Sequence, residues 1–400
     1  MLRFALKNMA IKWVQNILIV ISIVISAGIG VLAYNVASQV SDGITNNAGY
    51  YSLIVGPSGS KTQLAMNTMY FTDEPLGTIP YSVVTDLEKD GNRVTSVIPF
   101  AMADNYNGYG VVGTTSTFLK DKKIEKGELF DDESTLQAVI GHNIAKYNEL
   151  SVGDLIYTSH SANSAETHAQ GIKVVGILKE SYSSFDNVVF TQIRTLCEMH
   201  EHEGEEHAEE QEKHSHKTVC AVLVNTKNPG FAMQIVNEYD GKIIKNDEEK
   251  SYTLQAIEPM AVVRDVLNEA DDTKYIVFVL CAVILMMNIM VISIITLLNT
   301  YHSAKEISLM RLIGISMKKI NLLYILQNSI LGGVATILAF FVSKLCLNFM
   351  SGYVATMGVV LNIGKTYPLE WVILLGVFLI SVIPTVIWTF FTAKKDTISG

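Results

Sequence analysis

The chain has 400 residues, of which 49% are hydrophobic and only 17% charged, against roughly 25% charged in an ordinary soluble domain. Its formal net charge of −9 at pH 7 argues against a nucleic acid as a partner. Four blocks nearly without charge are each long enough to cross a bilayer, which takes roughly 20 apolar residues. These observations exclude a wholly soluble protein and predict an integral membrane protein of two or three structural units.

Residues 1–16 place Phe4, Met9 and Trp13 on one side of a helix among basic residues. This pattern predicts an amphipathic helix on the cytoplasmic membrane surface, although a plain basic flank fits equally well. Residues 17–41 are the first predicted transmembrane helix. Their apolar run is longer than a signal-peptide core and no clean cleavage site follows it, so we expect a retained anchor.

Residues 42–272 alternate short apolar runs with helical stretches, which predicts an α+β domain. The predicted strands lie at residues 51–55, 94–102, 110–112, 138–140, 155–158, 173–178, 188–190, 219–224 and 252–257. The predicted helices lie at residues 62–70, 191–199 and 231–239, and residues 259–274 are expected to run as a helix into the next span.

Three more transmembrane helices are predicted at residues 273–298, 320–346 and 369–393. A cytoplasmic loop at 299–319, a short outer loop at 347–368 and a tail at 394–400 complete the chain. Lysine and arginine concentrate in both terminal segments and in the 299–319 loop, so the positive-inside rule places these in the cytoplasm. Residues 42–272 then lie outside, and the protein is multi-pass.

Residues 56–62 read GPSGSKT and are similar to a phosphate-binding loop, but no glycine directly precedes Lys61. The predicted position of this segment outside the cell also removes it from ATP. We therefore expect a glycine-rich turn between a strand and a helix. The G-x-S-x-G and H-E-x-x-H patterns are absent from the sequence, so we expect no enzyme activity in this chain and ATP hydrolysis in a separate subunit.

Five histidines fall within residues 200–216 together with seven glutamates. Imidazole and carboxylate groups are ligands of Zn²⁺ and other transition metals, so this loop predicts metal binding, by a flexible loop rather than one rigid site. A solvated acidic loop with incidental histidines is the alternative. The predicted ligands are His200, His202, His207, His214 and His216.

His160 and His168 flank a second, small-residue loop with Glu166 nearby. They are predicted to supply a second metal site or to extend the first, and the alternative is two exposed polar residues. His142 is expected to begin a helix in a structural role. Cys197 and Cys220 bracket the histidine-rich loop, and a disulfide, thiolate ligation of a metal and neither of these all stay open.

Residues 305–316 read KEISLMRLIGIS, the chain opens with FALKNMAIKWVQNILIVI, and it closes with IPTVIWTFFTAKKDTIS. As a set these segments resemble the MacB/FtsX-like family of ABC transporter permeases, which has the same order of one helix, a large outer domain and three helices. Lys305 stands where the family usually has arginine, and Thr397 where proline is common. The chain also resembles a subgroup of this family with a histidine-rich insertion.

The resemblance implies an α-helical membrane protein with four transmembrane helices plus an extracytoplasmic α+β domain of two lobes, the MacB-like periplasmic core domain. It implies a bacterial inner membrane, with lipid around the spans, and a homodimer or a pair with a paralogue. It also implies a cytoplasmic ATPase whose motion reaches the outer domain by mechanotransmission. The residues that match the family's ATPase-contacting stretch are Lys305, Glu306, Met310, Arg311 and Gly314.

Three functions follow from these observations. The first is a permease linked to zinc handling, with an outer metal-binding or adaptor protein as a further partner. The second is a regulator that transmits ATPase motion to an outer partner such as a cell-wall hydrolase. The third is a membrane-anchored metal sensor or enzyme without an ATPase.

Overall fold

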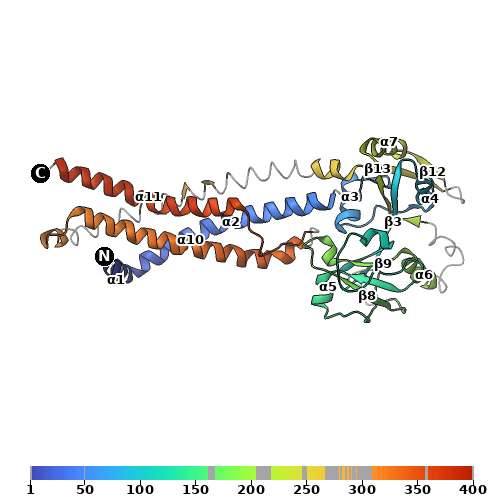
Figure 1. The fold of residues 1–400 in the computed structure, drawn as a ribbon, viewed down its shortest axis with the longest axis horizontal. Helices are drawn as coiled ribbons and strands as arrows, with labels where there is room; N and C mark the ends of the chain where they lie inside the picture. Colours follow the sequence, from blue (N-terminus) through green and yellow to red (C-terminus); the bar gives the residue numbers. More distant parts are fainter. Residues whose placement is uncertain are drawn as a thin grey trace. The chain divides into compact units, whose positions relative to one another are not determined.

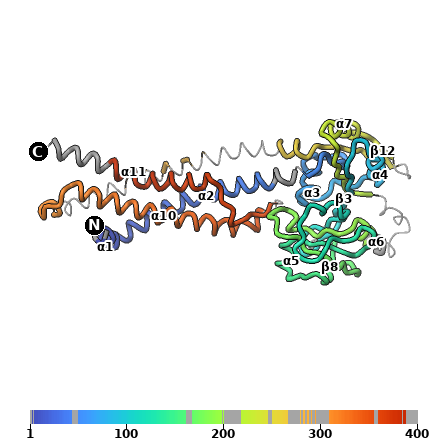
Figure 2. Tube along the Cα trace, in the orientation of Figure 1, coloured from blue at the N-terminus to red at the C-terminus, as the bar shows by residue number. Residues whose placement is uncertain are grey.

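The computed structural model describes residues 2–48, 50–160, 167–203, 218–245, 250–265, 309–355 and 359–398, with isolated residues between 279 and 294. The chain divides into two compact units. The helical unit comprises residues 1–39, 270–352 and 361–400, and the sheet unit comprises residues 40–269 and 353–360. Figures 1 and 2 follow the chain through both units in sequence colours.

The helical unit contains α1 (Leu2–Ile11), α2 (Trp13–Ala48), α10 (Met317–Ala355) and α11 (Pro368–Ile398). Within the described residues, three helical stretches are long and apolar enough to cross a membrane: Trp13–Gly43, Met317–Val354 and Pro368–Ile387. They contain the first and third predicted spans, at 17–41 and 320–346, and overlap the fourth, at 369–393, as far as Ile387. The second predicted span, at 273–298, falls almost wholly outside the described residues, so the fourth transmembrane helix stays a prediction.

A buried stripe on α2 packs the helical unit together. Ile19, Ile23, Ala27 and Val31 recur every four residues, which puts them on one face of the helix. They join a cluster with Leu374 and Val377 of α11 and with two small residues of α10, Ala335 and Ala339. Small side chains let helix backbones approach closely, which is how helices associate in lipid.

The sheet unit is built on an eleven-stranded mixed sheet in the order β12-β13-β1-β11-β3-β4-β9-β6-β8-β5, with β7 paired to β8. Its strands are β1 (Leu53–Pro57), β3 (Val94–Tyr106), β4 (Tyr109–Thr114), β5 (Ile124–Gly127), β6 (Gln137–Ile140), β7 (Leu155–Ile156), β8 (Ile172–Leu178), β9 (Val189–Gln192), β11 (Ala221–Thr226), β12 (Ile243–Lys245) and β13 (Ser251–Ile257). A separate two-stranded ladder joins β2 (Ile79–Pro80) to β10 (Thr218–Val219).

Helices cover this sheet along its length. They are α3 (Lys61–Tyr70), α4 (Ser82–Lys89), α5 (His142–Tyr147), α6 (Ile193–Glu203) and α7 (Pro229–Tyr239), with short 3₁₀ turns at Ser116–Leu119 and Ser184–Asn187. In Figure 1, α4 and α7 lie near β12 and β13, while α5 and α6 lie near β8 and β9. The strands form one continuous sheet, and the predicted division into two lobes stays a prediction.

Five phenylalanine rings form the centre of the core of the sheet unit. Phe71 lies edge-on to Phe185 with ring centroids 5.1 Å apart, and Phe190 lies 5.5 Å from both. Phe100 and Phe118 complete the cluster at 6.3 and 6.1 Å from Phe71. Aromatic pairs at these separations stabilise a core beyond their buried area.

The GPSGSKT segment forms the predicted turn between β1 and α3. The Ser60 hydroxyl accepts a hydrogen bond from the Gln63 backbone N–H at 3.2 Å, which caps the start of α3. The Lys61 ammonium lies 3.2 Å from the Asp240 carboxylate. These contacts give the segment a structural role.

Candidate metal centre

Asp104 lies in the second half of β3, where the strand pairing is irregular. β3 pairs with β4 so that Met102 faces Val112 and Asp104 faces Val111, which leaves one extra residue on β3. Such a bulge bends the strand and redirects the side chains beside it. The Asp104 side chain is fully buried.

The segment that ends at residue 160 reaches Asp104 through backbone pairing. Asn105 and Ser159 form a β-bridge, with hydrogen bonds of 2.7 and 2.9 Å in the two directions. The His168 N–H donates to the Thr158 carbonyl at 2.8 Å, so residues 158 and 168 lie side by side. His160 and His168 are therefore both held beside Asp104 by main-chain contacts.

One carboxylate and two imidazoles meet there. His160 Nδ1 lies 3.6 Å from Asp104 Oδ1, and His168 Nε2 lies 3.2 Å from Asp104 Oδ2. The two imidazole rings are nearly perpendicular, with centroids 4.7 Å apart. One ligand atom from each residue lies within 4.8 Å of the other two.

The spacing between Asp104 and His168 fits two ligands of a small tetrahedral metal ion. Ligand atoms at 2.0–2.1 Å from Zn²⁺ stand about 3.3 Å from one another at the corners of a tetrahedron. The separation of 3.2 Å between His168 Nε2 and Asp104 Oδ2 is close to that value, and His160 Nδ1 lies 3.6 Å from the other carboxylate oxygen, Oδ1. The donors are two nitrogens and one oxygen, a set that suits Zn²⁺ and other divalent transition metals.

The centre is closed on one side and open on the other. The side chains of Asp104 and His168 are 0% and 3% exposed, whereas that of His160 is 56% exposed. The Thr158 hydroxyl donates to Asp104 Oδ2 at 3.2 Å and orients the carboxylate, as outer-shell partners of metal ligands do. Three protein ligands with one exposed side leave room for a fourth ligand.

The structure brings His160 and His168 together beside Asp104, which sequence reasoning missed, and the predicted role of the two histidines as metal ligands stays a prediction. Glu166, His207, His214 and His216 lie outside the described residues. His200 and His202 belong to α6, but their side chains also lie outside the described part of the chain. The predicted metal binding by the histidine-rich loop stays a prediction.

His142 begins α5, as the sequence predicted, and its Nδ1 lies 3.0 Å from the Glu125 carboxylate. Cys197 and Cys220 form no disulfide. Cys220 is buried between β10 and β11, where its thiol lies 3.8 Å from the Met102 carbonyl, and burial raises the pKa of this thiol.

The segment that resembles the family's ATPase contact is described from residue 309 onward, so Lys305 and Glu306 lie outside the described residues. Met310 and Arg311 lie in a helical turn that ends at Gly314, whose φ of +88° suits a helix C-terminus. The Ile315 N–H donates to the Met310 carbonyl at 3.0 Å and closes this end. Arg311 is exposed.

No curated protein matches the chain. Among solved structures, the periplasmic region of MacB from Actinobacillus actinomycetemcomitans is similar at 10% sequence identity and a TM-score of 0.34, over 55% of this chain and 94% of that one. The model of the MacB-like periplasmic core domain family matches residues 17–235, more than half of the chain. The chain therefore belongs to the MacB/FtsX-like family of ABC transporter permeases.

Proposed function

We propose that this chain is a permease subunit that couples ATP hydrolysis by a separate cytoplasmic ATPase to movement of its sheet unit, and that this task is linked to transition-metal handling outside the cell. The family match supports the proposed role as a permease subunit, because the family implies an ABC ATPase partner and dimerisation. Mechanotransmission needs no substrate path through the spans, in keeping with their low content of charged residues.

An exposed apolar surface supports ATPase docking at residues 309–313. Leu312 and Ile313 are 83% and 80% exposed, and Leu309 is 59% exposed. Large apolar side chains gathered beside an exposed arginine are typical of a protein–protein contact. In the proposed topology this surface faces the cytoplasm, where an ATPase would cover it.

The metal part rests on the meeting of Asp104, His160 and His168. The three residues would hold the ion, and the exposed side at His160 would admit a fourth ligand from solvent, from the histidine-rich loop or from an outer metal-binding protein. An ion held there would bridge β3 to the residue 158–168 segment. Metal binding would then change the stability of the contact between β3 and the histidine-bearing residues.

Purification from native membranes tests the ATPase partnership. We expect the wild-type chain to copurify with ATP hydrolysis activity, and Arg311→Glu to lose most of it, because the substitution reverses the charge at the docking surface. Arg264→Glu is the matched control, since Arg264 is an exposed arginine of the sheet unit. Equal ATPase recovery with both variants would contradict the proposed docking surface.

The same purification separates the alternatives. Recovery of an ATPase together with a cell-wall hydrolase would favour the regulator. Recovery of no ATPase from wild-type membranes would favour a metal sensor that acts alone. The proposed function predicts an ATPase and zinc binding in the same preparation.

A further inference from the structure

The buried stripe of α2 changes from apolar to polar within the helical unit. After Ile23, Ala27 and Val31, the next two positions on this face are Asn35 and Gln39, which are 2% and 5% exposed. Buried amides in a membrane helix are costly unless their hydrogen bonds are satisfied, so they mark a specific contact.

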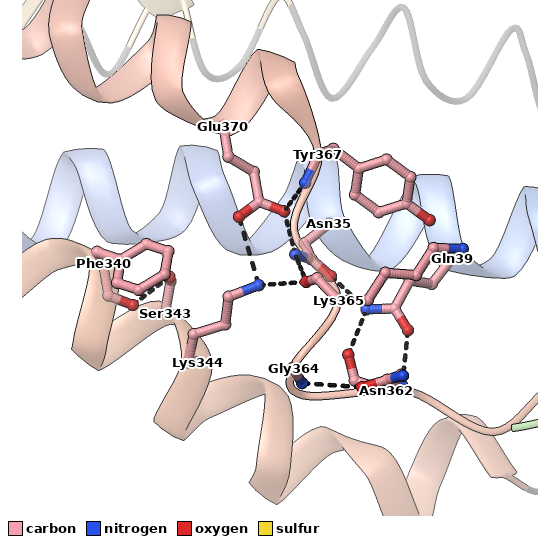
Figure 3. Close-up of polar contacts among 10 residues, drawn as sticks. All are labelled: Asn35, Gln39, Phe340, Ser343, Lys344, Asn362, Gly364, Lys365, Tyr367 and Glu370. Carbon is pink, nitrogen blue, oxygen red and sulfur yellow. Dashed lines mark hydrogen bonds and ion pairs between the residues drawn. The ribbon is translucent and has the colours of Figure 1, made fainter.

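Both amides bind the segment that connects α10 to α11, as Figure 3 shows. Gln39 Nε2 donates to the Asn362 carbonyl at 3.0 Å, and the Asn362 N–H donates to Gln39 Oε1 at 2.7 Å. Gln39 also donates to Asn35 Oδ1. The Gln39 side chain thus satisfies both backbone groups of Asn362.

Asn35 reaches a buried carboxylate at the start of α11. Its amide donates to Glu370 Oε1, which also accepts the Tyr367 N–H at 3.1 Å. Glu370 lies in the first turn of α11 and is 0% exposed. A carboxylate there caps the helix start and is favoured by the positive end of the helix dipole.

Lys344 of α10 neutralises that carboxylate. Its ammonium lies 3.3 Å from Glu370 Oε2 and donates to the Lys365 carbonyl at 2.7 Å (Figure 3). Lys344 is the one charged residue between positions 320 and 364. A buried ion pair is rarely worth its desolvation for stability alone, because an apolar pair of the same size often serves as well.

The network therefore gathers three helices on one short segment: α2 through Asn35 and Gln39, α10 through Lys344, and α11 through Glu370. We infer that Asn35, Gln39, Lys344 and Glu370 are positioning residues that fasten α2 to the α10–α11 hairpin. This inference rests on the proposed function, because α2 is the helix that continues toward the sheet unit. A displacement of the hairpin would then carry α2 with it.

The polar choice has a physical reason. Apolar packing along lipid-facing helices is non-directional and allows sliding or rotation, since lipid is as apolar as the partner helix. Hydrogen bonds to the backbone of one segment fix both the register and the rotation of α2. The amides thus hold α2 in one position, whereas the charged pair holds the segment to which they bind.

A distance measurement between two helices tests the inference without an ATPase. Spin labels at Ile29→Cys on α2 and Leu375→Cys on α11 would sit at lipid-facing positions, which are 43% and 58% exposed. The full chain in nanodiscs, with native cysteines replaced by alanine and labelled copies diluted by unlabelled ones, is expected to give one narrow distance distribution. Asn35→Leu/Gln39→Leu is expected to broaden it and to remove the single maximum.

Gln15→Leu is the matched control, because it makes the same kind of substitution on α2 away from the network. The control is expected to leave the distribution narrow. An unchanged narrow distribution in the Asn35→Leu/Gln39→Leu variant would overturn the inference. The distance measurement needs no ATP. Failure of the ATPase to copurify would therefore contradict the proposed function without affecting the inference that α2 is fastened to the hairpin.

The charged pair is tested by three variants of the same doubly labelled chain. Lys344→Met and Glu370→Gln alone each leave one buried group uncompensated and are expected to lower the thermal unfolding midpoint. Together they are expected to recover most of that loss and to keep the narrow distribution, because the amide oxygen introduced by Glu370→Gln can still accept from Asn35 and Tyr367. Lys365→Met is the control for loss of a charge in the same segment.

If the thermal unfolding midpoint of the double variant fell by the sum of the two single decreases, the pairing of Lys344 with Glu370 would be contradicted. Recovery of the midpoint with a broad distribution would show that the pair stabilises the hairpin but does not position α2, and would overturn that part of the inference.

Discussion

At the scale of single residues, the candidate metal centre depends on a carboxylate that no local pattern marks. Asp104 is one of many acidic residues in the chain, and its role arises from the β3 bulge and from a bridge to Ser159, more than fifty positions away. His160 and His168 could be predicted because their residue type is rare and they flank one loop. Sequence spacing cannot reveal a ligand that reaches the site through strand pairing.

Removing a ligand should weaken zinc binding by the full chain. Asp104→Asn and His168→Gln are each expected to lower the affinity by at least about tenfold, measured by calorimetry with Zn²⁺. The comparison should be made in a chain that lacks residues 204–217 and carries His200→Gln and His202→Gln, so that none of the five histidines of the histidine-rich loop contributes. His142→Gln is the control, since His142 pairs with Glu125 elsewhere.

Equal affinity in Asp104→Asn, His168→Gln and the control would show that the three groups form only a hydrogen-bonded ion pair. The metal part of the proposed function would then lose its support.

Lys122 provides a test of buried charge in the sheet unit. Its ammonium lies 3.9 Å from the ring centroid of Tyr50 and 3.7 Å from that of Phe185. Burial lowers the pKa of Lys122 to about 8, against an opposing effect of Asp121 and Asp186. The folded state thus releases this proton at lower pH than the unfolded state does.

The stability of the sheet unit should therefore rise as the pH increases from about 8 toward 10, where the unfolded chain binds more protons. Below pH 8 both states hold the proton and the cost of burial is fully present. The thermal unfolding midpoint between pH 7.5 and 9.5 measures this. In Lys122→Met the midpoint should rise less steeply with pH. An identical dependence of the midpoint on pH in the variant and the wild type would contradict the lowered pKa of Lys122.

At the scale of elements, alternation of apolar and polar residues was enough to find the main strands. Every predicted strand overlaps an observed one, and the helices at 62–70, 191–199 and 231–239 correspond to α3, α6 and α7. The sequence did not predict β2, β5 and β12, which have two to four residues and too few positions for a period to show. It also missed α4, which spans only Ser82–Lys89.

The close approach of β5 and β8 gives a prediction for one glycine. Gly127 has φ +77°, and a Cβ there would lie 2.1 Å from the Val175 carbonyl oxygen. Gly127→Ala should destabilise the sheet unit by about 2 kcal/mol or more, through both strain and the clash. Thermal unfolding of the full chain measures the loss.

Gly241 is the matched control, because its φ is +79° but nothing lies within 4 Å of a Cβ there. Gly241→Ala should cost only the backbone strain, about 1–2 kcal/mol. If Gly127→Ala and Gly241→Ala lowered the free energy of unfolding equally, the contact with Val175 would make no contribution to the loss of stability.

At the scale of the whole molecule, charge and hydropathy predict the membrane topology, which single elements do not. Nine basic and two acidic residues fall in the three segments predicted to be cytoplasmic, whereas the whole chain has a net charge of −9. The acidic remainder lies mostly in residues 42–272, on the opposite side of the membrane in this topology. Sequence could not show how the spans are fastened, because the contacts of Asn35 and Gln39 join positions more than 300 residues apart.

The central claim is that ATP hydrolysis moves the sheet unit. The most direct test is the distance between two copies of the permease in the assembled complex with its ATPase, each labelled at Met233→Cys on α7, an exposed position. We predict a shift of the distance distribution when ATP is added, and its return after hydrolysis. An unchanged distribution while ATP is being hydrolysed would contradict the account.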